Sequence, residues 1–336
     1  MQRRRLMQLL GLAAAAPTLA IGQPPAGWQD DDWVDAARQR RLPVRIRWPE
    51  GNAPCGLVVF SHGLGGDRSG GAVWAQAWQA AGLTVVAIQH PGSDTGIWRG
   101  GLPAARKGGS REQYLARIDD AHFVLDEIER RQRDDPAWQR IRPDAIGFCG
   151  HSFGARLTQA IAGEIPPGLQ RAAGSGLPAA ADAMRDARPR AFIAFSPGFG
   201  ATEGDADLSL AARARFGRIE RPFLCVTGTL DNAMMVGDAT NATRRAVYRG
   251  LPAGHKAELA LNGADHMTFG GRDLPVEPSA VLRREAGAVQ LEPGHRAVVA
   301  QVTSDWWRWR LLGDDAARGR LVAPAGLSAV DIWQQG

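Results

Sequence analysis

The centre of the chain reads Ala145-Ile146-Gly147-Phe148-Cys149-Gly150-His151-Ser152-Phe153-Gly154, and these residues set its fold. The apolar run over 145–149 has the composition of a buried strand, and a run with helical spacing follows over 153–163. A serine inside G-x-S-x-G at such a junction stands on a tight turn with its hydroxyl above the sheet. The glycines on either side remove side chains that would collide there. The motif therefore predicts that Ser152 is a nucleophile.

A glycine-rich turn occurs earlier in the chain, where Ser61-His62-Gly63-Leu64-Gly65-Gly66 follows an apolar strand over 57–60. Such a turn lets the backbone approach a substrate closely, as an oxyanion hole requires. The helix that starts at Phe153 also aims its first N–H groups at a developing oxyanion. We expect the backbone N–H groups of Leu64 and Phe153 to be the oxyanion donors, and His62 to brace the turn.

Strand-like and helix-like segments alternate outward from this centre. Continuous apolar runs predict buried strands over 56–60, 83–88, 145–149, 190–195, 222–226 and 257–261, the last of the core. Helical spacing predicts helices over 72–81, 111–131, 153–163 and 239–248, and a terminal helix from about 295 to 312 in which Trp306 stacks on Trp309. After a polar lead-in, residues 42–48 alternate apolar and basic side chains, as an antiparallel edge strand does. The alternation predicts an α/β fold, a mostly parallel sheet with helices on both faces.

The chain has 336 residues, of which 44% are hydrophobic, enough for one substantial core. We expect a single domain over 23–336 with loop insertions at about 91–110, 166–188 and 197–221, which are rich in Gly, Pro, Ala and charge. Loops that follow the strands of a parallel sheet form the rim of its active site. Large apolar side chains on or beside the catalytic loops are candidate substrate-binding residues: Trp98, Phe199, Met234 and Met267, with Phe153, Met235 and Phe269 as further candidates.

The general base has to come from seven histidines. Folds with this kind of nucleophile turn carry the serine, then the acid, then the histidine along the chain. His266 follows the predicted last strand, whereas His255 precedes that strand and His295 begins the terminal helix. We therefore expect His266 to be the base.

The acid is expected at the end of the strand before the last one. Thr227-Gly228-Thr229-Leu230-Asp231 lies there, and its carboxylate can hold the tautomer of His266 and stabilise the imidazolium. Asp265 is adjacent to the base and poorly placed to face its ring. Asp231 is the first choice, and the alternatives in neighbouring loops are Asp205, Asp207 and Asp238.

The amino terminus has the layout of a signal peptide. Arg3-Arg4-Arg5 precedes a short apolar run over 6–20 that ends in small residues. The run is shorter than the roughly 20 apolar residues of a membrane span, so no permanent membrane anchor is expected. We predict that residues 1–22 are a signal peptide and that the protein is exported, periplasmic or secreted. The paired arginines also permit a twin-arginine route.

The charge and the cysteine content argue against nucleic-acid binding, a disulfide framework and a zinc or redox site. The net charge of +5 falls to about +2 without the three leader arginines (5 minus 3), and the remaining arginines are interspersed with acids, so no nucleic-acid partner is expected. Three cysteines without a C-x-x-C pair indicate neither a disulfide framework nor a zinc or redox site, and they are expected to be small buried residues. The chemistry of a serine nucleophile requires no metal and no cofactor.

Three motifs of the chain resemble a known family. They read Phe60-Ser61-His62-Gly63-Leu64-Gly65, Ala87-Ile88-Gln89-His90-Pro91-Gly92-Ser93 and Gly150-His151-Ser152-Phe153-Gly154. They are similar to motifs of the platelet-activating-factor acetylhydrolase group and its dienelactone-hydrolase-like bacterial relatives, and the likeness covers roughly residues 33–269. The resemblance implies the α/β-hydrolase fold and a cofactor-free serine esterase for short acyl esters, with Leu64 and Phe153 as oxyanion donors.

The chain departs from each of these relatives at one site. In the acetylhydrolases the triad acid follows the strand directly after the nucleophile helix, where this chain has Phe195-Ser196-Pro197. Dienelactone hydrolases carry the acid one strand later, as Asp231 would be, but their nucleophile is a cysteine. Neither a phospholipid nor a lactone substrate is therefore transferred to this chain.

Together these patterns predict a serine carboxylesterase that hydrolyses small-molecule, short-acyl esters through Ser152, His266, Asp231 and an acyl-enzyme intermediate. One alternative is a secreted polyester depolymerase or lipase-like hydrolase, which needs an open, shallow cleft. The alternative of another class is a non-catalytic α/β-hydrolase-fold binding protein. Thioester and peptide substrates also stay open at this point.

Overall fold

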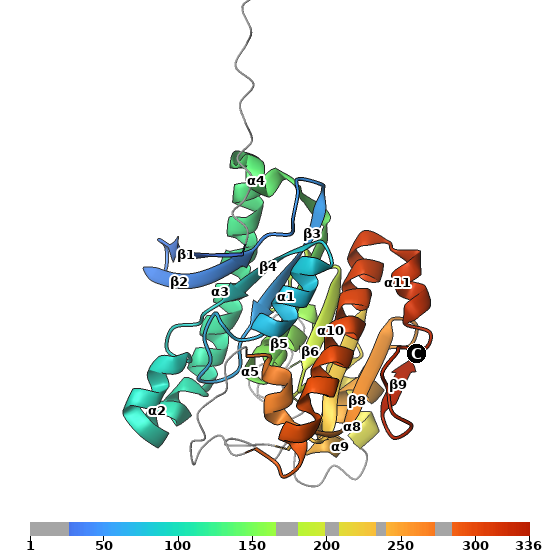
Figure 1. Cartoon of the computed structure of the whole chain (residues 1–336). Helices are drawn as coiled ribbons and strands as arrows, with labels where there is room; N and C mark the ends of the chain where they lie inside the picture. Colours follow the sequence, from blue (N-terminus) through green and yellow to red (C-terminus); the bar gives the residue numbers. More distant parts are fainter. Residues whose placement is uncertain (1–26, 166–180, 199–207, 233–239, 273–283) are drawn as a thin grey trace, which may run out of the picture.

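The computed structural model describes residues 27–165, 181–198, 208–232, 240–272 and 284–336 (Figure 1). The predicted signal peptide lies outside the described residues, as does most of the predicted loop over 166–188. So do several candidate site residues, namely Phe199, Asp205, Asp207, Met234, Met235 and Asp238.

The described residues form one nine-stranded sheet in the order β1-β2-β4-β3-β5-β6-β7-β8-β9 (Figure 1). The strands from β4 across to β8 pair in parallel, whereas the pairs β1–β2, β2–β4 and β8–β9 are antiparallel. The bounds are β1 (Trp28–Asp35), β2 (Arg40–Arg47), β3 (Cys55–Ser61), β4 (Leu83–Ile88), β5 (Ile141–His151), β6 (Ala191–Phe195), β7 (Phe223–Leu230), β8 (Lys256–Asp265) and β9 (Ile332–Gln335).

Helices cover both faces of the sheet, and each face has its own hydrophobic core. On one face lie α1 (Ala72–Ala80) and α10 (Ala288–Leu312). The other face carries α3 (Arg111–Asp134), α5 (Phe153–Ala162), α8 (Leu208–Phe216) and α9 (Asn241–Gly250). Shorter helices connect these elements: η1 (Thr95–Gly100), α2 (Gly101–Gly108), α4 (Pro136–Gln139), η3 (His266–Gly270) and α11 (Asp315–Arg320).

The central strands are mostly apolar because both of their faces are covered. Every residue of β3, β4 and β6 is buried. Such strands read as continuous apolar runs rather than as alternating ones, which is why the sequence pattern located them. The predicted core strands and helices are all present, and the mostly parallel α/β class is confirmed. Cys55, Cys149 and Cys225 are free and buried, as predicted.

Both edges of the sheet differ from the prediction. β2 is not the edge strand, because the polar lead-in forms β1 and pairs along the length of β2. The acids of β1 face arginines of β2, as in the 2.7 Å contact between Asp30 and Arg45, so ion pairs across the strands add to the burial of Trp33. β8 is not the last strand either, since β9 pairs antiparallel with it. β9 has only four residues, three partly buried and one exposed, which is too weak a pattern to predict.

The terminal helix starts earlier than predicted. Proline is unfavourable inside a helix because it lacks an N–H donor, and Pro293 lies just before the predicted start at about 295. Instead α10 begins at Ala288 and continues through this proline. Trp306 and Trp309 do meet, with ring centroids 5.9 Å apart, but their planes are perpendicular rather than stacked. An edge-to-face contact suits the aromatic quadrupole better than a sandwich.

The predicted loop over 91–110 is largely helical. The side chain of Asp94 accepts a hydrogen bond from the Gly96 N–H and caps η1, and α2 follows directly. Pro103 lies in the first turn of α2, where its missing N–H has no helical acceptor to lose. The predicted loop over 197–221 likewise contains α8. Gly and Pro residues obscured α2 in the sequence pattern, and those that precede α8 led to the prediction of a loop over its whole surroundings.

Candidate active site

Ser152 stands on the sharp turn between β5 and α5. Its backbone has a φ of 56° and a ψ of −109°, a conformation that non-glycine residues rarely adopt. The turn is tight: a Cβ on Gly154 would lie 2.0 Å from the carbonyl oxygen of Ser61, and one on Gly150 would lie 2.5 Å from Gly154. Both motif glycines are therefore required by backbone contact, and the turn lifts the partly exposed Ser152 above the sheet.

The side chains of Ser152, His266 and Asp231 form one line of close contacts. Nε2 of His266 lies 2.9 Å from Oγ of Ser152, and Nδ1 of His266 lies 2.8 Å from Oδ1 of Asp231. The three residues follow β5, β8 and β7, whose carboxyl ends meet at the same edge of the sheet. The structure thus brings together the three residues that the sequence predicted.

The buried side chain of Asp231 is an ionised carboxylate. Burial alone would raise its pKa, but the charge of Arg244 and the hydrogen bond from His266 outweigh burial and hold the pKa at about 2. A carboxylate can only accept hydrogen bonds, so Nδ1 of His266 carries the ring proton. The lone pair of Nε2 therefore faces the Ser152 hydroxyl, as a general base requires.

The two predicted oxyanion donors lie on either side of Ser152. Phe153 is the first residue of α5, and a Cβ on Gly63 would lie 3.3 Å from Cβ of Ser152, so the turn that carries Leu64 passes close to the serine. Within the described ranges, neither the N–H of Leu64 nor that of Phe153 has a hydrogen-bond acceptor. Both donors are therefore available to an oxygen that develops charge beside Ser152.

His151 and Asp265 support the loop that carries the base. Nε2 of the buried His151 donates to the carbonyl of His266 at 3.0 Å, and burial lowers the pKa of His151 to about 3, so it stays neutral. Asp265 turns away from the ring of His266 and accepts from the N–H of Thr268 at 3.0 Å and from Arg284 at 2.7 Å. Its carboxylate thus caps η3.

Arg244 is a site residue that the sequence did not reveal. It lies on α9, is buried, and its Nε is 2.9 Å from Oδ1 of Asp231. Its Nη1 also donates to the carbonyl of Ser196 at 2.9 Å. The sequence pattern does not say which partner an inward arginine of this helix meets, so only the tertiary structure assigns Arg244 to the site.

The predicted substrate-binding residues divide into three groups. Trp98 lies against the oxyanion turn, where its Nε1 donates to the carbonyl of Gly65 at 2.9 Å. Met267 follows the base directly and is partly exposed, so it stays a candidate. Phe269 is fully buried and belongs to the core instead. Phe199 and Met234 lie outside the described residues.

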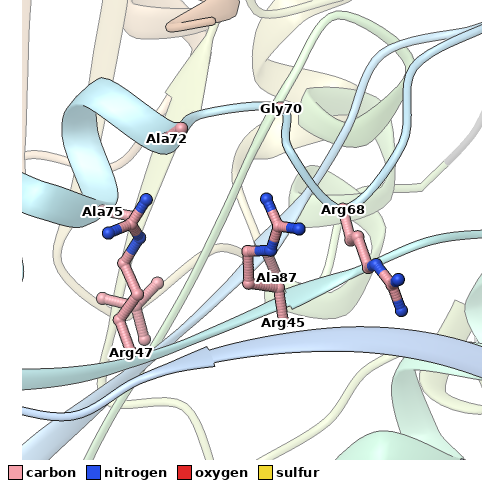
Figure 2. Close-up of a pocket in the computed structure, with 8 residues that line it drawn as sticks. Arg45, Arg47, Arg68, Gly70, Ala72, Ala75 and Ala87 are labelled. Carbon is pink, nitrogen blue, oxygen red and sulfur yellow. The ribbon is translucent and has the colours of Figure 1, made fainter. Parts of the chain in front are cut away.

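A small hollow elsewhere is lined by arginines rather than by catalytic candidates (Figure 2). Arg45 and Arg47 extend from β2 toward the start of α1, and Arg68 lies on the loop before that helix (Figure 2). Asp30 pairs with Arg45 at 2.7 Å and with Arg68 at 3.1 Å. These ion pairs account for much of the charge of the hollow, and none of its lining residues belongs to the Ser152 site.

In the described part of the chain, no group of three His, Cys, Asp or Glu side chains is arranged to hold a metal ion. The search for membrane spans over the same residues finds no helix of sufficient length and hydrophobicity.

Comparisons with known proteins bear on the fold alone. No family model matches the chain, and no curated protein matches it. A 2,6-dihydroxy-pseudo-oxynicotine hydrolase is 18% identical with a TM-score of 0.49, over 86% of this chain and 69% of that one. A dienelactone hydrolase from Anabaena variabilis is 18% identical with a TM-score of 0.48, over 84% and 99% of the two chains. An alpha-beta serine hydrolase homologue from Coxiella burnetii is 18% identical with a TM-score of 0.46, over 72% and 91%.

The fold of this chain is established by its own topology. A mostly parallel sheet has helices on both faces, and a serine stands on the strand-to-helix turn after β5. This is the α/β-hydrolase fold, as the sequence motifs predicted.

Proposed function

We propose that this chain is a serine hydrolase that cleaves carboxylic esters. The observation that carries the proposal is the unbroken line of contacts from the Asp231 carboxylate through the His266 ring to the Ser152 hydroxyl. The Asp231 carboxylate is ionised, the ring of His266 lies between it and the Ser152 hydroxyl, and two backbone N–H groups are available beside the serine.

The proposed reaction proceeds in two similar halves. His266 takes the proton of Ser152 while Oγ attacks the ester carbonyl, and the N–H groups of Leu64 and Phe153 stabilise the oxyanion. The C–O bond to the alcohol then breaks, and the alcohol leaves with the proton from His266. Water, deprotonated by His266, attacks the acyl-enzyme in the same way and releases the carboxylic acid and free Ser152. Asp231 stabilises the imidazolium in both halves.

The proposed substrates are small-molecule esters with short acyl groups. Support comes from the helices that crowd the oxyanion turn: Trp98 of η1 holds the Gly65 carbonyl, and Leu64 packs beside Gly108 of α2. Elements so close to the donors restrict the space for a long acyl chain or a polymer. They favour a short-acyl esterase over the polyester depolymerase or lipase-like alternative.

Export is the second part of the proposal and rests on sequence alone. A basic start followed by a short apolar run over 6–20 is typical of a signal peptide, so we propose that residues 1–22 direct the chain to the periplasm or outside the cell.

The test of function is reaction with a fluorophosphonate probe and with p-nitrophenyl esters, comparing the wild type with Ser152→Ala. We expect the wild type to be labelled and active, and Ser152→Ala to be folded, unlabelled and slower by about 10⁶ in kcat. Labelling of Ser152→Ala, or a rate above about a hundredth of the wild type, would reject Ser152 as nucleophile. A wild type that neither reacts with the probe nor cleaves any ester would favour the non-catalytic binding protein.

A further inference from the structure

A fully buried arginine lies beneath the oxyanion turn. Arg117 projects from the middle of α3 and has no exposed surface. No carboxylate of the described residues forms an ion pair with it. Burial lowers its pKa to about 9, which leaves the guanidinium charged at neutral pH. The charges of Asp120 and Asp94 attract it from beyond ion-pair distance. A buried cation without a direct ion-pair partner is costly, so its contacts with the backbone call for a functional explanation.

The guanidinium of Arg117 is held by backbone carbonyls of two loops. Its Nη1 donates to the carbonyl of His62 at 2.6 Å, and its Nη2 lies 3.4 Å from the carbonyl of Gly63. From the other side, Nε donates to Oγ of Ser93 at 2.8 Å, and Nη2 contacts the Ser93 carbonyl at 3.3 Å. Arg117 thus joins the turn after β3 to the loop after β4.

One of these carbonyls belongs to the peptide unit that supplies an oxyanion donor. The C=O of Gly63 and the N–H of Leu64 share one rigid plane, so donors that hold the carbonyl also fix where the N–H points. Nδ1 of His62 donates to the same Gly63 carbonyl at 2.6 Å, while its Nε2 accepts from the N–H of His90 at 3.1 Å. Hydrogen bonds to a carbonyl also polarise its peptide and strengthen the N–H on the far side.

Arg117 contacts the residue of the second donor as well. Its Cζ lies 4.5 Å from the centre of the Phe153 ring, within the range of a cation–π contact. One side chain therefore touches the turn that carries the Leu64 donor and the residue that supplies the other.

A second line of contacts, which runs from a serine through a histidine to an aspartate, supports this arrangement. Oγ of Ser61 lies 3.0 Å from Nε2 of His90, whose Nδ1 lies 3.0 Å from Oδ2 of Asp120. The contacts resemble those of the Ser152 site, but all three residues lack exposed surface, so no substrate can reach Ser61. Because His90 donates its backbone N–H to His62, this buried line holds His62 in the orientation that braces Gly63.

We propose that Arg117 is the positioning residue of the oxyanion hole: it fixes the Gly63–Leu64 peptide and packs on Phe153, so that both N–H donors face the tetrahedral intermediate. The inference rests on the proposed ester hydrolysis and names how that site is organised.

The sequence contained a weak signal for this role. Arg117 falls on the apolar stripe of its helix, three residues after Tyr114 and next to Ile118, instead of on the solvated face. A charged residue on a buried stripe requires hydrogen-bond partners inside the protein.

The test compares Arg117→Met and Arg117→Lys with the wild type, using p-nitrophenyl butyrate as substrate and an alkyl trifluoromethyl ketone as inhibitor. Oγ of Ser152 adds to the ketone carbon, its proton passes to His266, and the carbonyl electron pair becomes an oxyanion in the hole. We expect Arg117→Met to lower kcat by roughly 10- to 100-fold, less than outright loss of a donor, with little change in KM. Affinity for the ketone should fall in parallel with kcat/KM, and Arg117→Lys should restore part of both.

Arg131→Met is the matched control. Arg131 lies on the same helix, also packs over aromatic rings, and pairs with Glu127 at 2.7 Å at the end away from the oxyanion turn. This variant should lose thermal stability but keep normal kcat, KM and ketone affinity. If both arginine variants lost activity in proportion to their unfolding, the effect would be structural and the proposal would be wrong.

Ser93→Ala provides a milder perturbation if Arg117→Met does not fold. It removes the Oγ acceptor of the Arg117 Nε and should lower kcat and ketone affinity together. A folded Arg117→Met or Ser93→Ala with unchanged kcat and ketone affinity overturns the proposal, while the fluorophosphonate reaction of the wild type tests the esterase function separately.

Discussion

The Nε of Arg244 lies 2.9 Å from Oδ1 of Asp231, the same oxygen that faces Nδ1 of His266 at 2.8 Å. The acid is therefore held between a permanent cation and the ring that gains charge during the reaction. Arg244 also donates to the carbonyl of Ser196, so it ties the end of β6 to the end of β7. This bridge explains how a fully buried carboxylate stays ionised.

Arg244→Met should lower the stability of the protein at neutral pH and make that stability depend less on acid. A carboxylate with a lowered pKa stabilises the fold above its usual value of 3.8, and this contribution disappears as the pH falls through about 2. Without Arg244, burial would raise the pKa of Asp231 toward or above 3.8, so the variant should be less stable than the wild type at neutral pH, and the difference between the two should narrow as the pH falls through 3.8 toward about 2. Thermal unfolding between about pH 2 and 7 measures the shift. Arg249→Met, on the exposed side of the same helix, is the control, and identical curves for wild type and Arg244→Met would contradict the prediction.

Asp231→Asn should keep the shape of the site but favour the wrong tautomer of His266. We expect kcat to fall by up to ~10⁴. Asp205→Asn and Asp207→Asn should be nearly silent in the same p-nitrophenyl ester assay. A severe loss from either of those two, with a near-normal Asp231→Asn, would instead assign the acid to the loop after β6.

Gly154→Ala should destroy the nucleophile turn. The added Cβ would lie 2.0 Å from the Ser61 carbonyl oxygen, which is backbone and cannot move aside cheaply. We expect loss of fluorophosphonate labelling and a fall in Tm of several degrees, on the order of a 1–3 kcal/mol cost. Gly294→Ala in α10 is the control, because an added Cβ meets open space there. Full labelling of Gly154→Ala would show that the turn tolerates a side chain.

Short p-nitrophenyl esters should be better substrates than long ones, because η1 and α2 crowd the oxyanion turn. A series from acetate to palmitate measures kcat/KM as a function of acyl length. A higher kcat/KM for palmitate than for acetate or butyrate would contradict the prediction and favour the lipase-like alternative.

Protein recovered from the envelope or medium of its native host should begin between Ile21 and Ala26. Amino-terminal sequencing or intact mass measures this directly. Recovery of such protein with Met1 and Gln2 in place would contradict cleavage of a leader.

The parts of the site that follow strand ends were predictable from sequence. Parallel strands bring their carboxyl ends to one edge, so locating the strands before Ser152, Asp231 and His266 was enough to place the three residues together. Arg117 and Arg244 were not predictable in the same way, because their partners are distant in the chain. Arg117 contacts His62 across 55 residues and Arg244 contacts Ser196 across 48. Helical periodicity reports which face is buried, not which carbonyl an inward arginine meets.

The edge elements were missed for a different reason. β1 is stabilised by ion pairs with β2 and β9 is only four residues long, so neither carries the apolar signal that marks a central strand. Short helices such as α2 were obscured by Gly and Pro residues that are typical of loops.

The three cysteine thiols are buried, so their reaction with a reagent reports when the structure around them unfolds. Cys149 lies on β5 directly before the nucleophile motif, Cys225 lies on β7, and burial raises the pKa of both thiols well above their usual range. Few thiolates form, and reagents cannot reach the thiols while the sheet is folded. Alkylation of these cysteines should therefore follow the rate at which the sheet opens, so mass spectrometry of the modified peptides can time the unfolding of individual strands without any added label on the native protein.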